Sequence, residues 1–536
     1  MARAAVAAGE STAPSRARLG WQTTSTLLFL LVMAVLARVP ALLNARGVHS
    51  DAAIVGLQAM HILRGEWSWF LWGAGYQGSI DAILVAVGFA ITGPSALTLM
   101  LVPLIGHLIL VGLAFDMLRR SVGHGNALIA CLPLVLAPQA VNGVALYAPR
   151  QWSITTVFVS LWLATQFADR SRGPLWLAGS GLTAGLAVYF DLFTLQMLPA
   201  VAVFALWCAL SPLRRAAASS PGAAVRPRVA IWPLRIGGLV AGALAGALVV
   251  ACSRAQPVAD ASKATLSLDR WQANWALLTE TCLPYLLGLK MFIPDGTVGV
   301  VLWAPPPLMQ AMQWMGLLAF AVAVVWAVVA LARREVPPSV RRLGMLGLLG
   351  TISSVGGFLV SSMPEDWLSA RYLAPIIWFA PFTLAPAAHA LRTWRFGVAL
   401  APFVVTVGVG GWLAYGPYVQ GPLPVRDARG VAEEEAALAI ALRSHGVEYA
   451  AAQYWLSYRL GFLFEENPVV VPLDESADRY RPYRTAFEEA PVVAYIFHPS
   501  EPRAEPTPFE DRLREAGERY ERIEVRGFTV LLQHRR

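Results

Sequence analysis

The chain has 536 residues, of which 56% are hydrophobic and only 14% are charged, and its mean hydropathy is +0.54. This balance excludes an ordinary water-soluble protein. The net charge of +8 lies in short arginine clusters between apolar runs, so it indicates membrane topology and not nucleic-acid binding.

The N-terminus is basic and leads into a long apolar run. Arg3, Arg16 and Arg18 precede the run at 24–43, which is longer than the core of a typical signal peptide and lacks a small-residue cleavage site. We interpret residues 1–23 as a cytoplasmic tail and the run as an uncleaved first span. Nearly every basic residue is Arg, a bias that suggests a GC-rich bacterial genome, so we expect the inner membrane of a bacterium.

The apolar runs that follow predict a multi-pass α-helical protein. A helix needs about 20 apolar residues to cross a bilayer core, because its backbone polar groups must be satisfied within the segment. This rule predicts about eleven spans. They lie near 24–43, 96–118, 127–141, 153–168, 174–190, 191–210, 236–253, 309–332, 343–361, 371–390 and 397–417.

The run at 79–93 is short and begins with an acid, so it could be a weak span or a helix in the membrane surface. The later arginines decide between these alternatives. If the run does not cross, the clusters from Arg119 to Arg395 share the side of the basic N-terminus, as the positive-inside rule requires. We therefore predict that it does not cross, which leaves the C-terminus outside.

This topology predicts a membrane region at 24–423 with long outer loops at 44–95 and 254–308. Loops of this length usually have a function. Residues 424–536 have the composition of a small extracytoplasmic α/β domain, so the predicted fold class is an all-α membrane protein with an α/β domain at its end. The elements expected there are a helix near 430–444 and strands at 447–451, 468–472, 491–497 and 528–532.

Asp51 is the first residue that could carry chemistry. It follows the first span in an outer loop rich in Trp, Phe and Tyr, a composition typical of a membrane surface. The stretch IVGLQAMHIL would hold it against the bilayer, where a carboxylate can accept a proton from an acceptor hydroxyl. The alternative is that Asp51 only caps the helix that begins at Ala52, and the local pattern leaves both readings open.

The order of these features resembles membrane glycosyltransferases of the GT-C type. It consists of Asp51 shortly after the first span, a helix that ends in LRGE, the aromatic patch, YQGSIDAIL, and a span that ends in Arg119 and Arg120. These features look most like bacterial relatives of the protein O-mannosyltransferase and aminoarabinose transferase families, which are glycosyltransferase family 39-like. The resemblance is strongest over residues 20–120. It implies a polyprenyl-phosphate sugar as donor and Asp51 as catalytic base.

Two features depart from that pattern. Mannosyltransferase-like members often have Asp followed by Glu, whereas Ala52 follows Asp51 here, and the sequence around Asp81 lacks the family's proline-rich segment. The resemblance therefore indicates the GT-C superfamily and no particular branch of it.

A donor phosphate needs a cation, and the planar fork of Arg suits a phosphate. Arg371, in SARYLAPI at the outer mouth of a span, is the first candidate, and an Arg-Tyr pair there also resembles family members. Arg150, in YAPRQW, is the second. The alternative for both is an anchor at the membrane surface.

The remaining candidates have weaker patterns. Glu66, Tyr76, Gln77 and Asp81 could hydrogen-bond sugar hydroxyls or organise the loop, and Asp191, where two spans meet, could act on substrate or pair with a helix end. In the last domain, YWLSYRLGFLFEE contains Trp455, Tyr458 and Arg459. This run could be a platform for a glycan, although its helical spacing is more often that of a helix packed into a core.

No cofactor is indicated with certainty. His49 could tune Asp51 or bind a divalent metal, but no further ligand accompanies it. The four cysteines have neither metal-site nor disulfide spacing, and we expect them to be buried: Cys131, Cys208, Cys252 and Cys282.

The sequence thus predicts an inverting glycosyltransferase that moves a sugar from a polyprenyl-phosphate donor to a lipid, glycan or protein acceptor of the cell envelope. Membrane lipids are its other expected partners, and nucleic acid is not one. Three alternatives stay open, one of which is a non-catalytic assembly protein whose soluble domain recruits partners. A transporter or flippase would place acids near the middle of the membrane, and a polymerase or ligase for lipid-linked saccharides would use similar outer loops.

Overall fold

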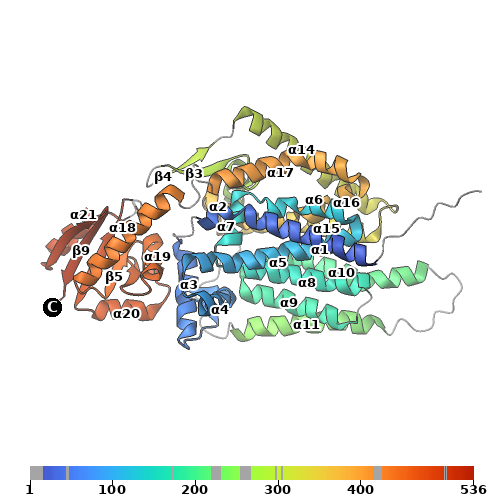
Figure 1. Cartoon of the computed structure of the whole chain (residues 1–536). Helices are drawn as coiled ribbons and strands as arrows, with labels where there is room; N and C mark the ends of the chain where they lie inside the picture. Colours follow the sequence, from blue (N-terminus) through green and yellow to red (C-terminus); the bar gives the residue numbers. More distant parts are fainter. Residues whose placement is uncertain are drawn as a thin grey trace, which may run out of the picture.

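The computed structural model describes residues 16–43, 48–170, 173–218, 231–253, 267–295, 299–303, 306–415, 425–499, 501 and 504–535. Long helices run side by side in a bundle, and a C-terminal α/β domain sits on one end of it (Figure 1). We call this the domain end of the bundle and the opposite one the far end.

The long helices coincide with the apolar runs of the sequence. Every predicted span lies on one of them or on a broken pair. The helices are α1 (Arg16–Leu36), α5 (Ala96–Val122), α6 (His124–Val135), α7 (Gln139–Leu146), α8 (Gln151–Arg170), α9 (Leu175–Phe190), α10 (Leu198–Ala218), α11 (Ile231–Ser253), α14 (Pro307–Ala332), α15 (Pro338–Val360), α16 (Pro375–Ala390) and α17 (Thr393–Tyr415).

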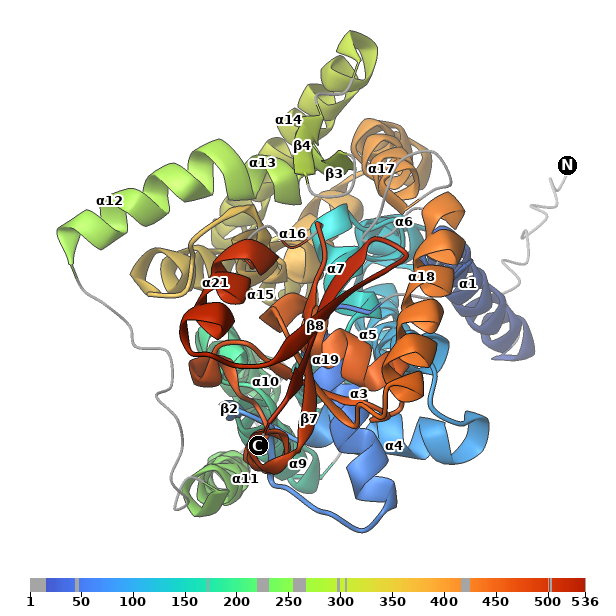
Figure 2. The ribbon, with the colours of Figure 1, turned by 90° about the vertical axis from the view of Figure 1, so that its left-hand side faces the viewer.

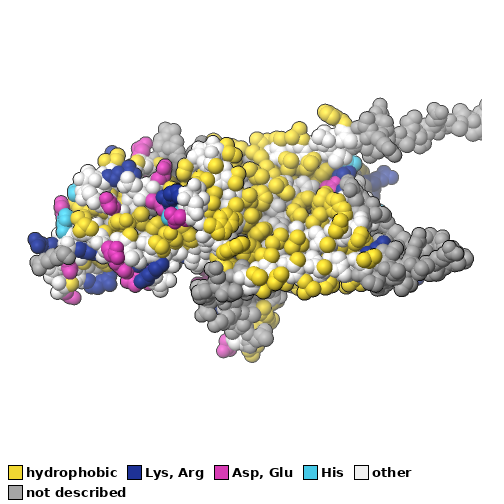
Figure 3. Space-filling model, turned by 90° about the horizontal axis from the view of Figure 1, so that it is seen from below, with side chains coloured by type: hydrophobic (Ala, Val, Ile, Leu, Met, Phe, Trp, Pro, Cys, Tyr) yellow, Lys and Arg dark blue, Asp and Glu magenta, His cyan; other side chains and the backbone are white. Residues whose placement is uncertain are grey.

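The surface of the bundle is that of a membrane protein. Its middle is covered by hydrophobic side chains, whereas charged side chains gather on the C-terminal domain (Figure 3). Leu248 of α11 and Leu318 of α14 are more than 60% exposed, as lipid-facing residues are. Five of the described helices are long and apolar enough to cross a membrane, or up to seven if each bent pair is one span. The chain is a multi-pass membrane protein.

Two predicted spans are broken, which the sequence analysis did not foresee. The run at 127–141 is α6 followed by α7 with a bend of 82°, and the run at 371–390 includes the 3-10 helix η4 (Trp367–Leu373), bent by 41° from α16. Pro138 precedes α7 and leaves carbonyls at the end of α6 without helical partners. The buried Arg38 donates to two of them, the carbonyl oxygens of Leu134 and Val135, at 3.2 and 3.0 Å.

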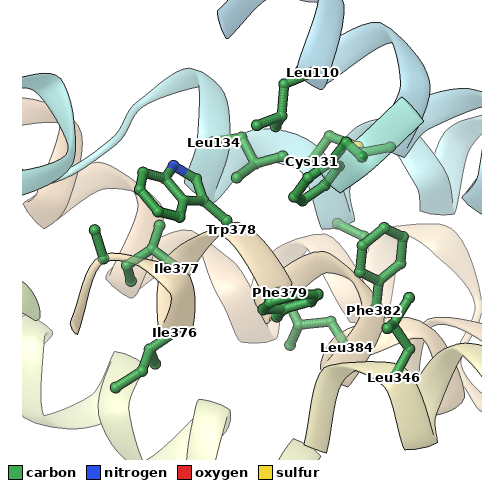
Figure 4. Packing of buried hydrophobic residues seen from close by; sticks show 14 of the residues in the cluster. Leu110, Cys131, Leu134, Leu346, Ile376, Ile377, Trp378, Phe379, Phe382 and Leu384 are labelled. Carbon is green, nitrogen blue, oxygen red and sulfur yellow. The ribbon is translucent and has the colours of Figure 1, made fainter. Parts of the chain in front are cut away.

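Helix α16 forms the centre of the bundle. Its side chains are mostly apolar on every face, as is typical of a helix in the centre of a bundle. All of its residues from Pro375 to Pro386 are buried, so protein surrounds the helix on every side. Figure 4 shows Trp378, Phe379 and Phe382 of α16 packed with Leu134 of α6 and Leu346 of α15. A Cβ atom at Gly347 of α15 would lie 2.2 Å from the backbone nitrogen of Thr383, so the close approach of α15 needs a glycine there.

The cysteines follow the prediction with one exception. Cys131, Cys208 and Cys282 are buried, but Cys252 is exposed, so the expectation of burial was wrong for that residue. It lies near the end of α11, whose surface is largely uncovered by protein.

The described residues of the loop predicted at 44–95 lie across the domain end. Helix α3 runs across the direction of the long helices (Figure 1), and α4 is only 13 residues long. At about 1.5 Å per residue α4 spans roughly 20 Å, which is less than a bilayer core of about 30 Å. The elements are α2 (Val39–Leu43), α3 (Ser50–Leu63), the β1–β2 hairpin (Phe70–Leu71 and Ala74–Gly78) and α4 (Ile80–Thr92).

The second outer loop is only partly described, since residues 254–266, 296–298 and 304–305 lie outside the described residues. Its short elements contact the ends of α15 and α17. They are α12 (Leu268–Leu277), the π-helical turn η3 (Leu278–Cys282), α13 (Leu283–Leu286), and the antiparallel strands β3 (Met291–Asp295) and β4 (Gly299–Trp303).

The C-terminal domain is a mixed five-stranded sheet with helices around it, in the strand order β6-β5-β7-β9-β8. Strands β6, β5 and β7 are parallel, and β9 and β8 are antiparallel to their neighbours. Figure 2 shows this domain over the middle of the domain end. Its elements are α18 (Val425–Ser444), β5 (Tyr449–Ala452), α19 (Tyr454–Leu463), β6 (Val469–Pro472), η5 (Glu475–Ala477), α20 (Arg481–Glu489), β7 (Val492–Phe497), α21 (Pro506–Glu515), β8 (Tyr520–Val525) and β9 (Phe528–His534).

The four predicted strands are present as β5, β6, β7 and β9. The sequence analysis missed β8, an edge strand whose residues Glu521, Arg522 and Glu524 interrupt the apolar alternation. Charges of this kind protect an edge strand from pairing with another chain, and they also hide its pattern.

Candidate active site

Asp51 lies in the first turn of α3. The N-cap of this helix is His49, whose Nδ1 accepts a hydrogen bond from the backbone N–H of Ala52 at 3.3 Å. The alternative in which Asp51 serves as the cap is therefore wrong, and its carboxylate is available for other contacts.

One oxygen of Asp51 is held by the C-terminal domain. The Tyr454 hydroxyl donates to Oδ1 of Asp51 at 2.7 Å, and the Arg479 guanidinium donates to the Tyr454 oxygen at 3.0 and 3.2 Å. Burial, together with the charge of Asp51, raises the pKa of Tyr454 well above its usual range, so its proton stays in place. Among the described residues, Tyr454 is the only side chain hydrogen-bonded to the Asp51 carboxylate.

Helix α19 brings Tyr454 to this place by packing on α3. A Cβ atom at Gly56 of α3 would lie 2.5 Å from Cε2 of Phe462, so the ring fits only because residue 56 is glycine. Tyr458 and Phe462 share a buried cluster with α3, whereas Leu456 and Leu460 point into the core of the domain. The Ser50 hydroxyl also donates to the Tyr454 carbonyl at 2.6 Å.

A second group of polar side chains surrounds the buried Asp191. Nε of Arg150 and Nε2 of Gln77 each donate to its Oδ2 at 2.8 Å, and the backbone N–H of Phe193 donates to Oδ1 at 2.8 Å. Asp191 caps η1 (Leu192–Met197) through that last bond. Burial is the largest single influence on Arg150 and lowers its pKa, but the Asp191 carboxylate together with the Tyr372 and Tyr76 phenols outweighs burial, so the pKa of the guanidinium is raised.

The backbone at Arg150 is strained. Its φ angle is 127°, a region that residues with a side chain rarely adopt. Such strain persists only where the surroundings impose it, and it gathers at functional sites. Here the guanidinium is fixed between the Asp191 carboxylate and the Phe193 ring, whose centroid is 4.4 Å away.

Asp81 is a buried carboxyl next to this group. Burial raises its pKa to about 7, partly opposed by a hydrogen bond from the Arg150 backbone, and the nearby Asp191 raises it further. One of its oxygens, Oδ1, is buried without a partner among the described residues. Burial therefore favours the neutral form of Asp81 more than is usual for a carboxyl group.

Arg371 lies at the end of η4, just before the buried helix α16. Its guanidinium contacts the Tyr372 ring at 5.2 Å and donates to the Tyr372 hydroxyl at 3.3 Å. Arg150 contacts the same ring at 5.5 Å, so the two guanidiniums share one phenol. Within the part of the chain that the structure describes, no carboxylate forms an ion pair with Arg371.

His49 and Tyr76 connect these groups. Burial lowers the pKa of His49, and the charges of Asp51 and Arg371 both act on it, in opposite directions. Burial raises the pKa of Tyr76, on which the charges of Arg479, Arg150, Asp191 and Asp51 also act. The structure thus gathers eight of the predicted site residues into one neighbourhood at the domain end. They are His49, Asp51, Tyr76, Gln77, Asp81, Arg150, Asp191 and Arg371.

Glu66 lies elsewhere. It is beyond the other end of α3, where Oε2 contacts Nδ1 of His61 at 2.6 Å and accepts a hydrogen bond from the Tyr480 hydroxyl at 3.2 Å. The structure therefore associates Glu66 with the contact between the loop and the C-terminal domain, and not with the group around Asp51.

The aromatic run of the C-terminal domain is a packed helix. Tyr458 is buried, and Arg459 forms an ion pair with the buried Glu435 at 2.5 Å. The interpretation of this run as a core helix is confirmed for these residues. Sequence reasoning passed over Tyr454, the first residue of this run, together with Arg479, because no local pattern shows that either lies near Asp51.

The described residues contain no group of three or more His, Cys, Asp or Glu side chains that could hold a metal ion.

Residues 80–225 match the family of dolichyl-phosphate-mannose-protein mannosyltransferases. The resemblance to membrane glycosyltransferases predicted from the sequence is confirmed over this stretch. The match begins at α4 and extends past α10, so it includes Asp81, Arg150 and Asp191 but neither Asp51 nor Arg371. No curated protein sequence matches the chain.

Among solved structures, the chain is similar to ArnT from Cupriavidus metallidurans in the apo state, with 12% identity and a TM-score of 0.44 over 96% of this chain and 98% of that one. The structure of that ArnT bound to undecaprenyl phosphate has 11% identity and a TM-score of 0.44, over 97% of this chain and 98% of that one. The apo oligosaccharyltransferase of Archaeoglobus fulgidus has 11% identity and a TM-score of 0.49, over 90% of this chain and 70% of that one. Likenesses at this level assign no role to a side chain of this chain.

Proposed function

We propose that the chain is an inverting glycosyltransferase that moves a sugar from a polyprenyl-phosphate donor to a hydroxyl of a cell-envelope acceptor. One observation carries the proposal. Asp51, a carboxylate with one open oxygen, and Arg371, which forms no ion pair with a carboxylate of the described residues, both lie close enough to His49 for their charges to shift its pKa, at one end of an apolar bundle. A lipid-linked phosphate would reach this place from the bilayer, and an acceptor would reach it from the water.

In the proposed reaction, Asp51 takes the proton of the acceptor hydroxyl through its open oxygen Oδ2. The acceptor oxygen then bonds to the anomeric carbon of the sugar from the side opposite the phosphate. The bond between that carbon and the phosphate oxygen breaks, and the polyprenyl phosphate leaves with the electron pair. Since the attack comes from the opposite side, the configuration at the anomeric carbon is inverted.

The arginines have different parts in this scheme. The planar fork of Arg371 is free to make paired bonds to phosphate oxygens and to stabilise the charge that grows on the leaving group. Arg150 is already bound through Nε to Asp191 and is fixed by its strained backbone. We therefore assign Arg371 to direct phosphate binding, and Arg150 to a fixed positive charge beside it.

The match to dolichyl-phosphate-mannose-protein mannosyltransferases supports a lipid-phosphate sugar as the donor, because dolichyl phosphate mannose is a donor of that kind. The polar groups lie at the domain end and not midway along the long helices, which argues against a transporter, whose substrate groups bind near the membrane midplane.

The proposal includes an orientation. Arg119, Arg120 and Arg342 lie at the far end of the bundle, and the positive-inside rule assigns the end that carries short basic loops to the cytoplasm. The domain end, with Asp51 and residues 425–535, then faces the outside of a bacterial inner membrane.

The test uses the full-length protein purified into liposomes with a defined polyprenyl-phosphate sugar and extracted envelope acceptors. We expect sugar to move to an acceptor with release of polyprenyl phosphate in equal amount, and the product linkage to be inverted. Movement of intact donor between leaflets, without release of polyprenyl phosphate, would overturn the proposal in favour of a flippase.

A further inference from the structure

We propose that Tyr454 of the C-terminal domain is a positioning residue for Asp51, and that this domain is therefore a part of the active site. The inference rests on the proposed function, because it assumes that Asp51 acts as the base. Tyr454 touches neither donor nor acceptor in this scheme. It acts by fixing which oxygen of Asp51 faces the acceptor.

The geometry of the hydrogen bonds carries the first step. Oδ1 of Asp51 is occupied by the Tyr454 hydroxyl at 2.7 Å, so rotation of the carboxylate about its Cβ–Cγ bond would break that bond. The Tyr454 oxygen accepts from two nitrogens of Arg479, which orients its proton toward Asp51. The open oxygen Oδ2 is thereby held in one direction, and a positioned base is more effective than a rotating one.

The supports of Arg479 carry the second step. Its Nη1 donates to the Gly73 carbonyl at 2.7 Å, and its backbone N–H donates to the Tyr458 hydroxyl at 2.6 Å. A Cβ atom at Gly73 would lie 2.4 Å from Cδ of Arg479, and the φ angle of Gly73 is +60°, so this hairpin residue must be a glycine. Arg479 therefore ties Tyr454, the membrane hairpin β1–β2 and helix α19 into one unit.

The topology of the domain carries the third step. Tyr454 directly follows β5, and Arg479 lies in the connection after β6. Both positions are at the carboxyl ends of parallel strands, and β6 and β7 lie on opposite sides of β5. In open α/β sheets this edge, where the strand order reverses, is where ligands bind. Here the edge faces Asp51.

The experiment compares Tyr454→Phe with wild type in the liposome assay. Phe keeps the ring and its packing but loses the hydroxyl, so we expect kcat to fall by about 10- to 100-fold, the scale of a lost hydrogen bond to a charged group. The KM for the polyprenyl-phosphate sugar should change less than about 3-fold, because the base does not touch the donor phosphate. The matched control is Tyr495→Phe, which removes a hydroxyl of the same domain that contacts Gln533 and Arg535 instead.

A double-mutant cycle shows whether Tyr454 acts through Asp51. In the Asp51→Asn background, adding Tyr454→Phe should slow the residual reaction by less than about 2-fold, since the base that it positions is gone. Equal slowing in both backgrounds would show a structural role and overturn the inference. A Tyr454→Phe protein with wild-type kcat would also overturn it, and would leave the proposed function intact as long as Asp51→Asn is inactive.

Failure of the proposed function gives a different result. If wild type and Asp51→Asn release polyprenyl phosphate at the same rate, Asp51 is not the base and Tyr454 has nothing to position. Arg479→Met also tests whether Tyr454 positions Asp51, because this change keeps the Tyr454 hydroxyl but removes the guanidinium that orients it. We expect about 10-fold slower turnover.

Discussion

Polar side chains of the C-terminal domain contact α3 near each of its ends, on either side of the apolar packing of α19. The two polar contacts differ in how completely their charges are paired. The first, which we call the catalytic contact, consists of Asp51, Tyr454 and Arg479. The second, which we call the docking contact, lies at the other end of α3, about 15 Å away for ten residues of helix. It consists of His61, Arg64, Glu66, Glu466 and Tyr483.

In the docking contact, each ring nitrogen of His61 faces a carboxylate, with Nδ1 2.6 Å from Glu66 and Nε2 2.6 Å from Glu466. Arg64 and the Tyr483 hydroxyl also bind Glu466, and Trp72 stacks on Tyr480 at 4.0 Å. In the catalytic contact, one carboxylate oxygen is left open. The comparison indicates that the paired end holds the domain and the open end performs the chemistry.

The largest expected effect comes from Asp51→Asn. Asn is nearly isosteric and its oxygen can still accept from Tyr454, but it cannot take a proton. We expect turnover to fall by roughly 100-fold or more, the usual scale for a general base, with unchanged expression and thermal unfolding. The control is Asp511→Asn, which makes the same change at an exposed acid in α21 of the C-terminal domain. A purified Asp51→Asn protein with near wild-type turnover would end the distinction between the two contacts.

The next effect concerns Arg371. Arg371→Ala should lower kcat/KM by roughly 100-fold, because the growing charge on the phosphate loses its partner, whereas Arg371→Lys should recover only part, since lysine lacks the planar fork. Turnover and donor affinity are measured with Arg395→Ala, at the far end of the bundle, as control. Unchanged donor affinity and turnover in Arg371→Ala would reduce this residue to an anchor at the membrane surface.

A smaller effect is expected in the docking contact. His61→Leu leaves the partly buried Glu466 without one of its partners and should lower the free energy of unfolding by about 1–3 kcal/mol. Hydrogen exchange of α19 should become faster. The loss of turnover should be restored by conditions that stabilise the protein, which distinguishes it from Asp51→Asn. If His61→Leu stayed folded, docked and yet inactive, the chemistry would extend to this end of α3.

The docking contact also predicts a pH dependence. Hydrogen bonds from His61 lower the pKa of Glu66, and those from His61 and Tyr483 overcome burial to lower the pKa of Glu466. Both glutamates bind protons more weakly in the docked state. Their contribution is therefore complete above the ordinary value of 4.5 and is lost as the pH falls through the lowered pKa. Thermal unfolding between pH 3 and 7 should show this in wild type and much less in Glu466→Gln.

The smallest effect, none on activity, is expected from topology probes. In a cysteine-free variant, a cysteine at Ser121 should resist an impermeant thiol reagent in intact spheroplasts, and one at Ser476 should react. Ser219, a further predicted cytoplasmic site, lies outside the described residues. The reverse labelling pattern would place both contacts on the cytoplasmic side and contradict the proposed orientation.

Much of the fold could be predicted because the bilayer imposes a simple rule on each span by itself. The runs that contain α5, α14 and α15 exceed the necessary length and need no partner to be recognised. The bend between α6 and α7 was not predicted, although Pro138 marks it, because the apolar run continues through the proline. Edge strand β8 was missed since its charges break the alternation.

The site was predicted residue by residue, but its pairings were not. Asp51 could be identified from its place after the first span, and Arg150 and Asp191 were both candidates. That Arg150 binds Asp191, or that Tyr454 binds Asp51 across 403 positions of sequence, depends on how the elements dock. A hydrogen bond between residues far apart in the chain leaves no local sequence pattern, so it cannot be predicted from a single sequence.

The clamp of Arg38 on α6 has a consequence for biogenesis. The guanidinium lies just after α1, where it can bind the Ala34 carbonyl of that helix at once, but its carbonyl partner at Val135 is made 97 residues later. At synthesis rates of roughly 5–20 residues per second, about 5–20 s separate the two. A buried arginine that still lacks its bonds to the α6 carbonyls is costly inside the lipid, so we expect α1 to remain near the membrane surface until α6 has been inserted. Arg38→Leu should then speed the insertion of α1 while weakening the finished bundle.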